Sequence, residues 1–112
     1  MSKKREINVG RDFSKHPAGR YREDGPNSGQ RFREDFLLPS LKGDAALIVT
    51  LDGTRGFGSS FLEEAFGGLV RAGLSGEFLQ QRLTVQGRDI GYVSEANQYI
   101  QDAADRLAKQ SI

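Results

Sequence analysis

Two adjacent serines, Ser59 and Ser60, follow a glycine-rich segment and precede a run in which apolar and acidic residues alternate. Residues 53–60 fit the phosphate-binding pattern G-x-x-x-x-G-K-[ST] at every specified position except the lysine, which Ser59 replaces. That lysine carries the charge that reaches the outer phosphates, so we expect no nucleotide hydrolysis. A helix that begins here would offer free amides and its dipole to a bound phosphate or a phosphoserine, whereas a plain helix cap is the simpler role of such a serine.

Other residue types that carry chemistry are sparse. His16 is the only histidine and the chain has no cysteine, which excludes a thiol nucleophile and a thiolate metal site. Glu63 and Glu64 are neighbours and would point in different directions on a helix, which argues against a catalytic acid pair. The sequence therefore predicts no enzymatic activity, no metal and no cofactor. Asp52 ends an apolar segment, where it is either a ligand contact or a turn residue.

Length and charge limit the remaining classes of function. A chain of 112 residues with a net charge of +1 fits one soluble domain spanning residues 1–112, and it lacks the basic excess of a nucleic-acid binder. No apolar stretch approaches the roughly 20 residues that cross a bilayer, so we expect no membrane partner. The lack of cysteine favours a reducing compartment, which makes the cytoplasm the expected location. The sequence does not determine the oligomeric state.

The apolar pattern alternates strands with helices and predicts an α/β domain with a small mixed, mostly parallel sheet. A long loop is expected at residues 11–27. Strands are expected at residues 5–9, 45–51 and 82–87, the second of them central and covered on both faces. Helices are expected from Ser28 to just beyond Pro39, from Ser60 to Gly73, and from Ser94, or as early as Ile90, to Leu107.

The helix after the serines has two notable features. Ser60 and Glu63 have the spacing of a capping box. The apolar residues that follow have the 3-4 spacing of one helix face, which would leave Glu63 and Glu64 on the outer face. Gly67 and Gly68 lie inside the helix, where each costs about 1 kcal/mol relative to alanine. They predict either close packing of the helix on the sheet or a surface that a partner's backbone approaches.

Four arginines lie in or just after the long loop: Arg20 and Arg22 within it, and Arg31 and Arg33 in the helix that follows. If this loop folds over the serine segment, these side chains would bring positive charge to it. The alternative is that they are exposed and interact with solvent.

Val49-Thr50-Leu51-Asp52-Gly53 and the segment at residues 57–69 resemble the STAS-like domains of unknown function, relatives of the STAS domains of bacterial anti-sigma factor antagonists. In that better-known family, a serine at the start of a helix is phosphorylated by a partner of the histidine-kinase-like ATPase fold, which breaks the complex. By position, Ser60 corresponds to that serine and Ser59 to its neighbour. Gly58 and Phe61 stand where the family has an aspartate and a glycine.

The resemblance implies a regulatory protein-interaction module whose partner is a histidine-kinase-like ATPase or a serine kinase. A second hypothesis is a sensor that binds a nucleotide or another phosphorylated ligand at the helix N-terminus, with Arg20 and Arg55 supplying charge. Ser60 and Ser59 are the candidate phosphorylation sites. The candidate contacts for a partner or a phosphate are Asp52, Gly53, Arg55, Gly58, Glu64, Gly67, Gly68 and Arg20.

Overall fold

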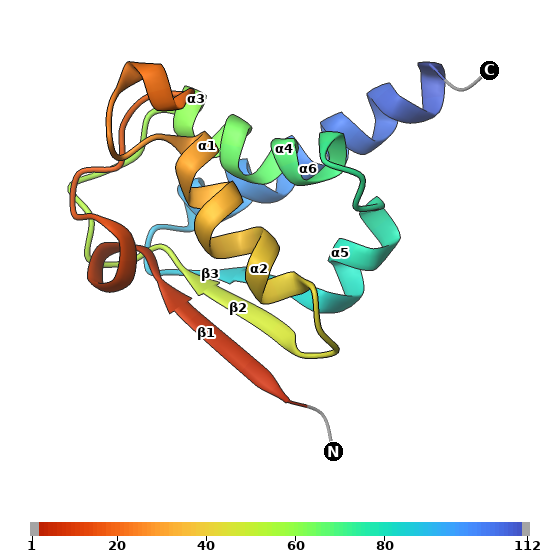
Figure 1. Cartoon of the computed structure of the whole chain (residues 1–112), viewed down its shortest axis with the longest axis horizontal. Coiled ribbons are helices and arrows are strands. Elements are labelled where there is room, and N and C mark those ends of the chain that lie inside the picture. The colour runs from red at the N-terminus through yellow and green to blue at the C-terminus, as the bar shows by residue number, and fades with distance from the viewer. Residues whose placement is uncertain (1–2, 111–112) are drawn as a thin grey trace.

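A three-stranded parallel sheet forms the base of the computed structural model, which describes residues 3–110 (Figure 1). Residues 1, 2, 111 and 112, the ends of the predicted domain, lie outside the described residues. The strands are β1 (Lys4–Asn8), β2 (Ala46–Thr50) and β3 (Leu83–Gln86), in the order β1-β2-β3. The α/β fold with a central second strand is thus confirmed. The sheet is simpler than expected, because both described strand pairs are parallel.

Within residues 3–110, two composite helices and two simple ones pack against this sheet. Helix 29–41 consists of α1 (Gly29–Phe32), a π-helical turn and α2 (Leu38–Leu41). Helix 59–71 likewise consists of α3 (Ser59–Leu62), a π-helical turn and α4 (Gly68–Arg71). They are followed by α5 (Gly76–Arg82) and α6 (Ile90–Gln110).

The long segment between β1 and helix 29–41 has little regular structure. It contains one π-helical turn, Val9–Phe13, and one 3-10 turn, Arg22–Asp24. None of the helices within residues 3–110 combines the length and the apolar character that crossing a membrane requires.

One face of the sheet carries the core. Ile7, Val49 and Val85 stand side by side in the strand register, and all three are buried. Figure 1 shows α1, α2, α4 and α6 on a single side of the sheet. This arrangement follows from the strand order, because right-handed crossovers that advance in one direction put all their helices on the same face.

The opposite face of the sheet has no helix over it among the described residues. Glu6, Ile48 and Thr84 stand side by side there, with Glu6 and Thr84 exposed and Ile48 half-buried. The prediction that the strand at residues 45–51 is covered on both faces is therefore wrong. Residues 45–49 of this run are all apolar, but their burial alternates, since Leu47 and Val49 are buried whereas Ile48 is not.

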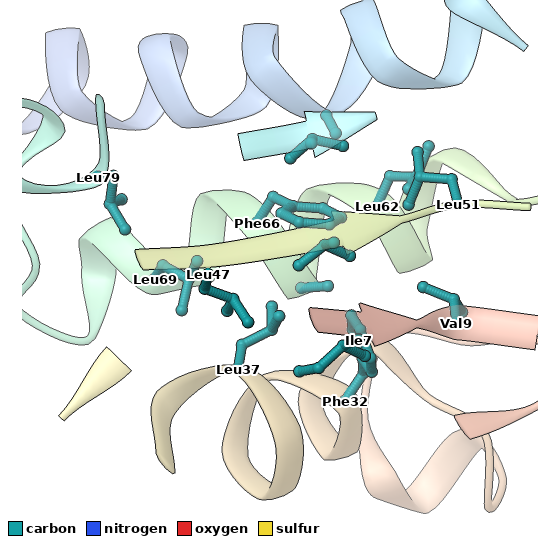
Figure 2. Packing of buried hydrophobic residues seen from close by; sticks show 14 of the residues in the cluster. Ile7, Val9, Phe32, Leu37, Leu47, Leu51, Leu62, Phe66, Leu69 and Leu79 are labelled. Carbon is teal, nitrogen blue, oxygen red and sulfur yellow. The ribbon is translucent and has the colours of Figure 1, made fainter. Parts of the chain in front are cut away.

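Aromatic rings pack between helix 29–41 and helix 59–71. Figure 2 labels two of them, Phe32 and Phe66, among the buried core residues. Phe32 is fully buried, and its ring centroid lies 5.9 Å from that of Phe61 and 6.5 Å from that of Phe66. Phe13, from the turn after β1, packs against Phe32 at 5.0 Å. The cluster therefore positions the start of helix 59–71, which carries the two serines.

The predicted helix ends are confirmed at two places. Ser28 caps helix 29–41, its hydroxyl oxygen accepting a hydrogen bond from the Arg31 amide at 3.1 Å. Gly73 ends helix 59–71 with a φ of 110°, and the Leu74 amide donates to the Leu69 carbonyl at 3.1 Å. This is the Schellman arrangement, in which a left-handed glycine lets the chain leave the helix.

Candidate functional site

The two serines lie on the surface at the start of helix 59–71. Gly58 is the N-cap, with φ −78° and ψ 151°, and Ser59 is the first helical residue. Ser59 and Ser60 are exposed, and within the described part of the chain no side chain makes a capping hydrogen bond at this end. The prediction that Ser60 caps the helix is therefore wrong. The capping box fails because Glu63 is engaged by Arg20 and Arg71 instead of reaching back.

Ser28 and Ser60, which were both predicted to cap a helix, should therefore respond differently to substitution by alanine. Ser28→Ala removes the acceptor of a buried capping bond and is expected to lower the free energy of unfolding by about 1 kcal/mol. Ser60→Ala removes an exposed hydroxyl and is expected to change it by less than about 0.5 kcal/mol. Urea denaturation of the two variants measures the difference. Equal losses would contradict the observed position of the helix start.

A cavity of about 330 Å³ lies beside the serine loop, where the carboxyl ends of β2 and β3 meet. Of the predicted contacts, Asp52, Gly53 and Arg55 line it together. Arg88 and Tyr92, which sequence reasoning missed, line it from the chain after β3. The available signal was topological, because parallel strands bring the residues after their carboxyl ends to one edge of the sheet.

The Asp52 carboxylate joins the loops around this cavity. Its Oδ1 accepts a hydrogen bond from the Arg88 amide at 2.9 Å, while its carbonyl accepts one from the Gly10 amide at 3.3 Å. The Cβ of any other residue at position 10 would collide with the backbone of Gly53, whose φ is 82°. Asp52 is thus a structural link between loops as well as a lining residue.

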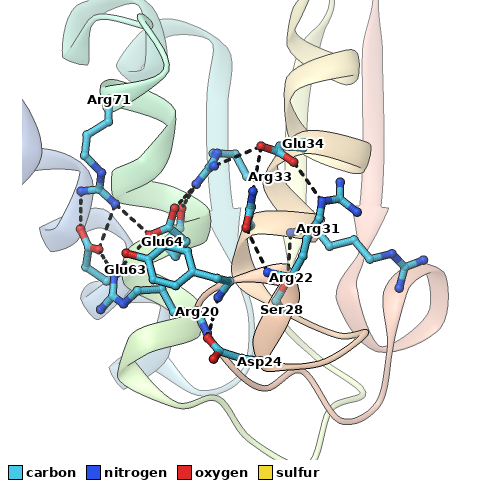
Figure 3. Close-up of polar contacts among 12 residues, drawn as sticks. Arg20, Arg22, Asp24, Ser28, Arg31, Arg33, Glu34, Glu63, Glu64 and Arg71 are labelled. Carbon is cyan, nitrogen blue, oxygen red and sulfur yellow. Dashed lines mark hydrogen bonds and ion pairs between the residues drawn. The ribbon is translucent and has the colours of Figure 1, made fainter.

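The ion-pair cluster consists of Arg20, Arg33, Arg71, Glu63 and Glu64 and lies along helix 59–71 (Figure 3). Arg33 contacts Glu64 at 2.5 Å between Nη1 and Oε2, and the Glu64 side chain is only 8% exposed. Arg71 donates two hydrogen bonds to Glu63, at 2.7 and 3.0 Å. The prediction that Glu64 faces outward is therefore wrong, because Arg33 of the neighbouring helix pairs with it inside the protein.

Arg20 connects the long loop to this cluster. Its Nη1 lies 2.5 Å from Oε1 of Glu63, so the loop does fold over helix 59–71. The positive charge is neutralised there by carboxylates. Of the other arginines considered, Arg22 pairs with Glu34 and Asp35 at the surface, and Arg31 packs over the ring of Phe13.

Gly67 and Gly68 are buried, and both allow other groups to come close. A Cβ on Gly68 would collide with the guanidinium group of Arg33. A Cβ on Gly67 would meet the Glu63 carboxylate and lie 3.3 Å from the Tyr99 carbonyl of α6. The two glycines thus make room for Arg33 and α6. The expectation that they allow the helix to pack closely on the sheet is wrong. Their contact with a partner stays a prediction.

The acid stability of the protein should depend on Glu63. Burial acts to raise the pKa of Glu63, but hydrogen bonds from Arg71 and Arg20 outweigh it and hold this pKa below its ordinary value of 4.5. The resulting stabilisation is fully present above that value and is lost as the pH falls through the lowered pKa of the folded state. Urea denaturation between neutral and acidic pH should show a smaller acid loss for Glu63→Gln than for wild type. Identical pH profiles would contradict this role of Glu63.

His16, the single histidine of the sequence, does not line the cavity beside the serine loop. His16 is exposed in the long loop, where its amide donates to the Ser14 hydroxyl at 2.9 Å. Within residues 3–110, no three His, Asp or Glu side chains come together as metal ligands would.

The fold is α/β and is built on a parallel β-sheet. A loop of glycines and serines follows the central strand, and a helix starts at that loop. These are the features of a STAS-like domain. The sequence profile described as STAS-like domain of unknown function (DUF4325) matches residues 28–89. Since the match covers more than half of the chain, the protein belongs to this family, which confirms the resemblance. The matched region runs from the helix cap Ser28 to Asp89 at the cavity. Comparison with curated proteins and with solved structures gave no match.

Proposed function

We propose that this protein is a non-enzymatic, cytoplasmic regulatory domain that binds a protein partner through the loop and helix at residues 53–70 and is switched by phosphorylation of Ser60. The partner is a histidine-kinase-like ATPase or a serine kinase, as the resemblance to anti-sigma factor antagonists implies. The observation that carries the proposal is the exposed Ser60 hydroxyl, which makes no capping bond at the start of a helix whose inner face is fully buried. A kinase can reach this oxygen without unfolding the helix.

The surroundings of Ser60 suggest what a phosphate would do. A phosphoserine adds about 1.5 to 2 negative charges, which the first turn of a helix tolerates. Glu63 and Glu64 are three and four residues further on, so they lie one turn from Ser60 on the same side of the helix. The phosphate would repel these carboxylates and compete with Glu63 for Arg20, which now holds Glu63 at 2.5 Å. Phosphorylation would thereby change how the long loop sits against the start of helix 59–71.

Charge substitutions at the two serines test this switch. Histidine-kinase-like ATPases from the source organism would be purified and titrated with wild type, Ser60→Ala and Ser60→Asp by calorimetry. We expect one ATPase to bind wild type and Ser60→Ala equally, and Ser60→Asp more weakly by about tenfold or more, which is about 1.4 kcal/mol.

Ser59→Asp is the matched control, since it adds the same charge one residue earlier. An equal loss for Ser59→Asp and Ser60→Asp would contradict the specific role of Ser60. If Ser60→Asp binds the ATPase as tightly as wild type, that result would also contradict this role.

The second candidate function, binding of a phosphorylated small molecule, has one observation in its favour. Arg55 and Arg88 both line the 330 Å³ cavity at the edge of the sheet where α/β proteins bind ligands. Arg20 is paired with Glu63, so the charge for such a ligand would come from Arg55 and Arg88.

Thermal unfolding with ATP, ADP and inorganic phosphate tests this alternative. A ligand present at 100 times its dissociation constant stabilises by about 2.7 kcal/mol. We expect a rise in Tm that Arg55→Ala and Arg88→Ala each remove. An unchanged Tm with all three ligands would contradict this function.

A further inference from the structure

A second concave surface lies on the other side of β3, away from β2. This groove has a volume of about 750 Å³ and is formed by α5, β3 and α6. Among the described strands, β3 pairs only with β2, so its other edge faces the groove without a partner strand. We name this surface the β3-edge groove.

The hydrogen-bonding groups on this edge follow from the strand register. The Gln86 carbonyl accepts a hydrogen bond from the Leu51 amide at 2.9 Å, so Gln86 and Thr84 direct their backbone groups to the β2 side. By alternation, Leu83 and Val85 direct theirs to the groove. The Leu83 amide is not available to an added strand, because it already donates to the Leu79 carbonyl at the end of α5. The Val85 amide and carbonyl and the Leu83 carbonyl are left for an added strand.

The side chains around the groove indicate what kind of strand would fit. Leu79 is buried at its base, and Leu83 and Ile100 are half-buried beside it, which offers an apolar floor. Glu77 is exposed at the rim, and the described residues that line the groove include no lysine or arginine. Asp105 adds a second carboxylate next to the lining residue Gln101, whose Nε2 donates to it at 2.8 Å. The surface is therefore negative above an apolar floor.

We propose that the β3-edge groove binds an extended, basic segment of a partner protein as a fourth strand of the sheet. The added strand pairs with the free backbone groups of Leu83 and Val85. Its apolar side chains face the floor, and its alternate lysine or arginine side chains face Glu77. Main-chain pairing supplies affinity in this mode of recognition, and the alternate side chains supply specificity. This contact is separate from the serine loop and does not depend on the switch at Ser60.

Synthetic peptides test the proposal with the full chain. The probe is a fluorescein-labelled octapeptide in which valine and lysine alternate, and the controls are its valine-glutamate counterpart and a lysine peptide with alternate N-methylated amides. We expect the lysine peptide to bind about tenfold more tightly than either control. Hydrogen exchange of the Val85 amide should slow when it binds.

Glu77→Lys changes an exposed residue and is expected to reverse the preference between the lysine and glutamate peptides. Three results would overturn the proposal: no binding of the lysine peptide, equal binding of the N-methylated peptide, or binding that leaves Val85 exchange unchanged. If the Val85 amide is instead protected in the protein alone as its concentration rises, a second copy of this chain occupies the groove. That outcome also overturns the proposal.

Discussion

Replacing Glu64 by glutamine is expected to lower the free energy of unfolding by about 3 kcal/mol, because one member of a buried ion pair loses its charge. The Glu64 and Arg33 side chains are 8% and 11% exposed. Arg33 would lose its buried carboxylate partner and keep only Glu34, at 3.5 Å, whose side chain is 39% exposed. The Nε of Arg33 already has no hydrogen-bond partner among the described residues, which adds to the cost. Urea denaturation at neutral pH measures the change.

The neighbouring residue provides the matched control. Glu63→Gln makes the same chemical change one residue earlier, at a side chain that is 22% exposed and whose partners Arg20 and Arg71 are 31% and 43% exposed. It is expected to cost no more than about 1 kcal/mol. The combined change Glu64→Leu and Arg33→Met removes both buried charges and should recover most of the loss. Equal effects of Glu63→Gln and Glu64→Gln would contradict the burial of the pair.

Replacing Phe32 by alanine is expected to lower the free energy of unfolding by about 3 to 5 kcal/mol, the range for truncating a buried phenylalanine. The Phe32 ring is fully buried and contacts the rings of Phe13, Phe36, Phe61 and Phe66. Its loss leaves a cavity between helix 29–41 and helix 59–71. In a small domain this is a large share of the total stability.

Phe32→Leu is the control for Phe32→Ala, since it keeps most of the volume and is expected to cost less than about 1.5 kcal/mol. Urea denaturation followed by circular dichroism compares the two variants. If Phe32→Ala has no cooperative transition while Phe32→Leu unfolds normally, the prediction is met in its extreme form. A loss below about 1 kcal/mol for Phe32→Ala would contradict the central place of this ring.

Most elements of the fold could be predicted from local patterns. Apolar alternation located β1 and β3, a run of β-branched residues located β2, and the 3-4 spacing of apolar residues located helix 29–41, helix 59–71 and α6. The short helix α5 was not expected, and Arg82, assigned to the following strand, is its last residue. The number of covered faces could not be predicted, because Ile48 is as apolar as Val49 although only Val49 is buried. What decides this is the side to which both crossovers carry their helices.

The misassigned helix cap shows how a contact distant in sequence overrides a local signal. Ser60 and Glu63 have the better capping-box pattern, whereas Ser28 has an arginine at the corresponding position, yet Ser28 is the serine that caps its helix. Glu63 pairs with Arg20, which lies 43 residues earlier in the chain. No local pattern contains this pairing.

Burial of Glu64 has the same kind of cause. Its position on the helix indicated exposure, but Arg33 crosses from the neighbouring helix to meet it. The close passage of that arginine also explains why position 68 is glycine.

The candidate site was predicted in part. Asp52, Gly53 and Arg55 lie together at the cavity, as residues after a central strand should. Arg88 and Tyr92 were missed, because nothing in the sequence marks them apart from their position after β3. The exposure of Ser59 and Ser60 depends on where the helix starts, which the structure places at Ser59.

Mapping the phosphorylated residue tests the central claim most directly. The chain would be incubated with MgATP and the ATPase that binds it, then analysed by intact-mass measurement and by fragmentation of the peptide that spans residues 53–71. The account predicts the mass of one added phosphoryl group, located on Ser60, and no addition to Ser60→Ala. An unmodified wild-type chain, or a phosphate on another residue that persists in Ser60→Ala, would contradict it.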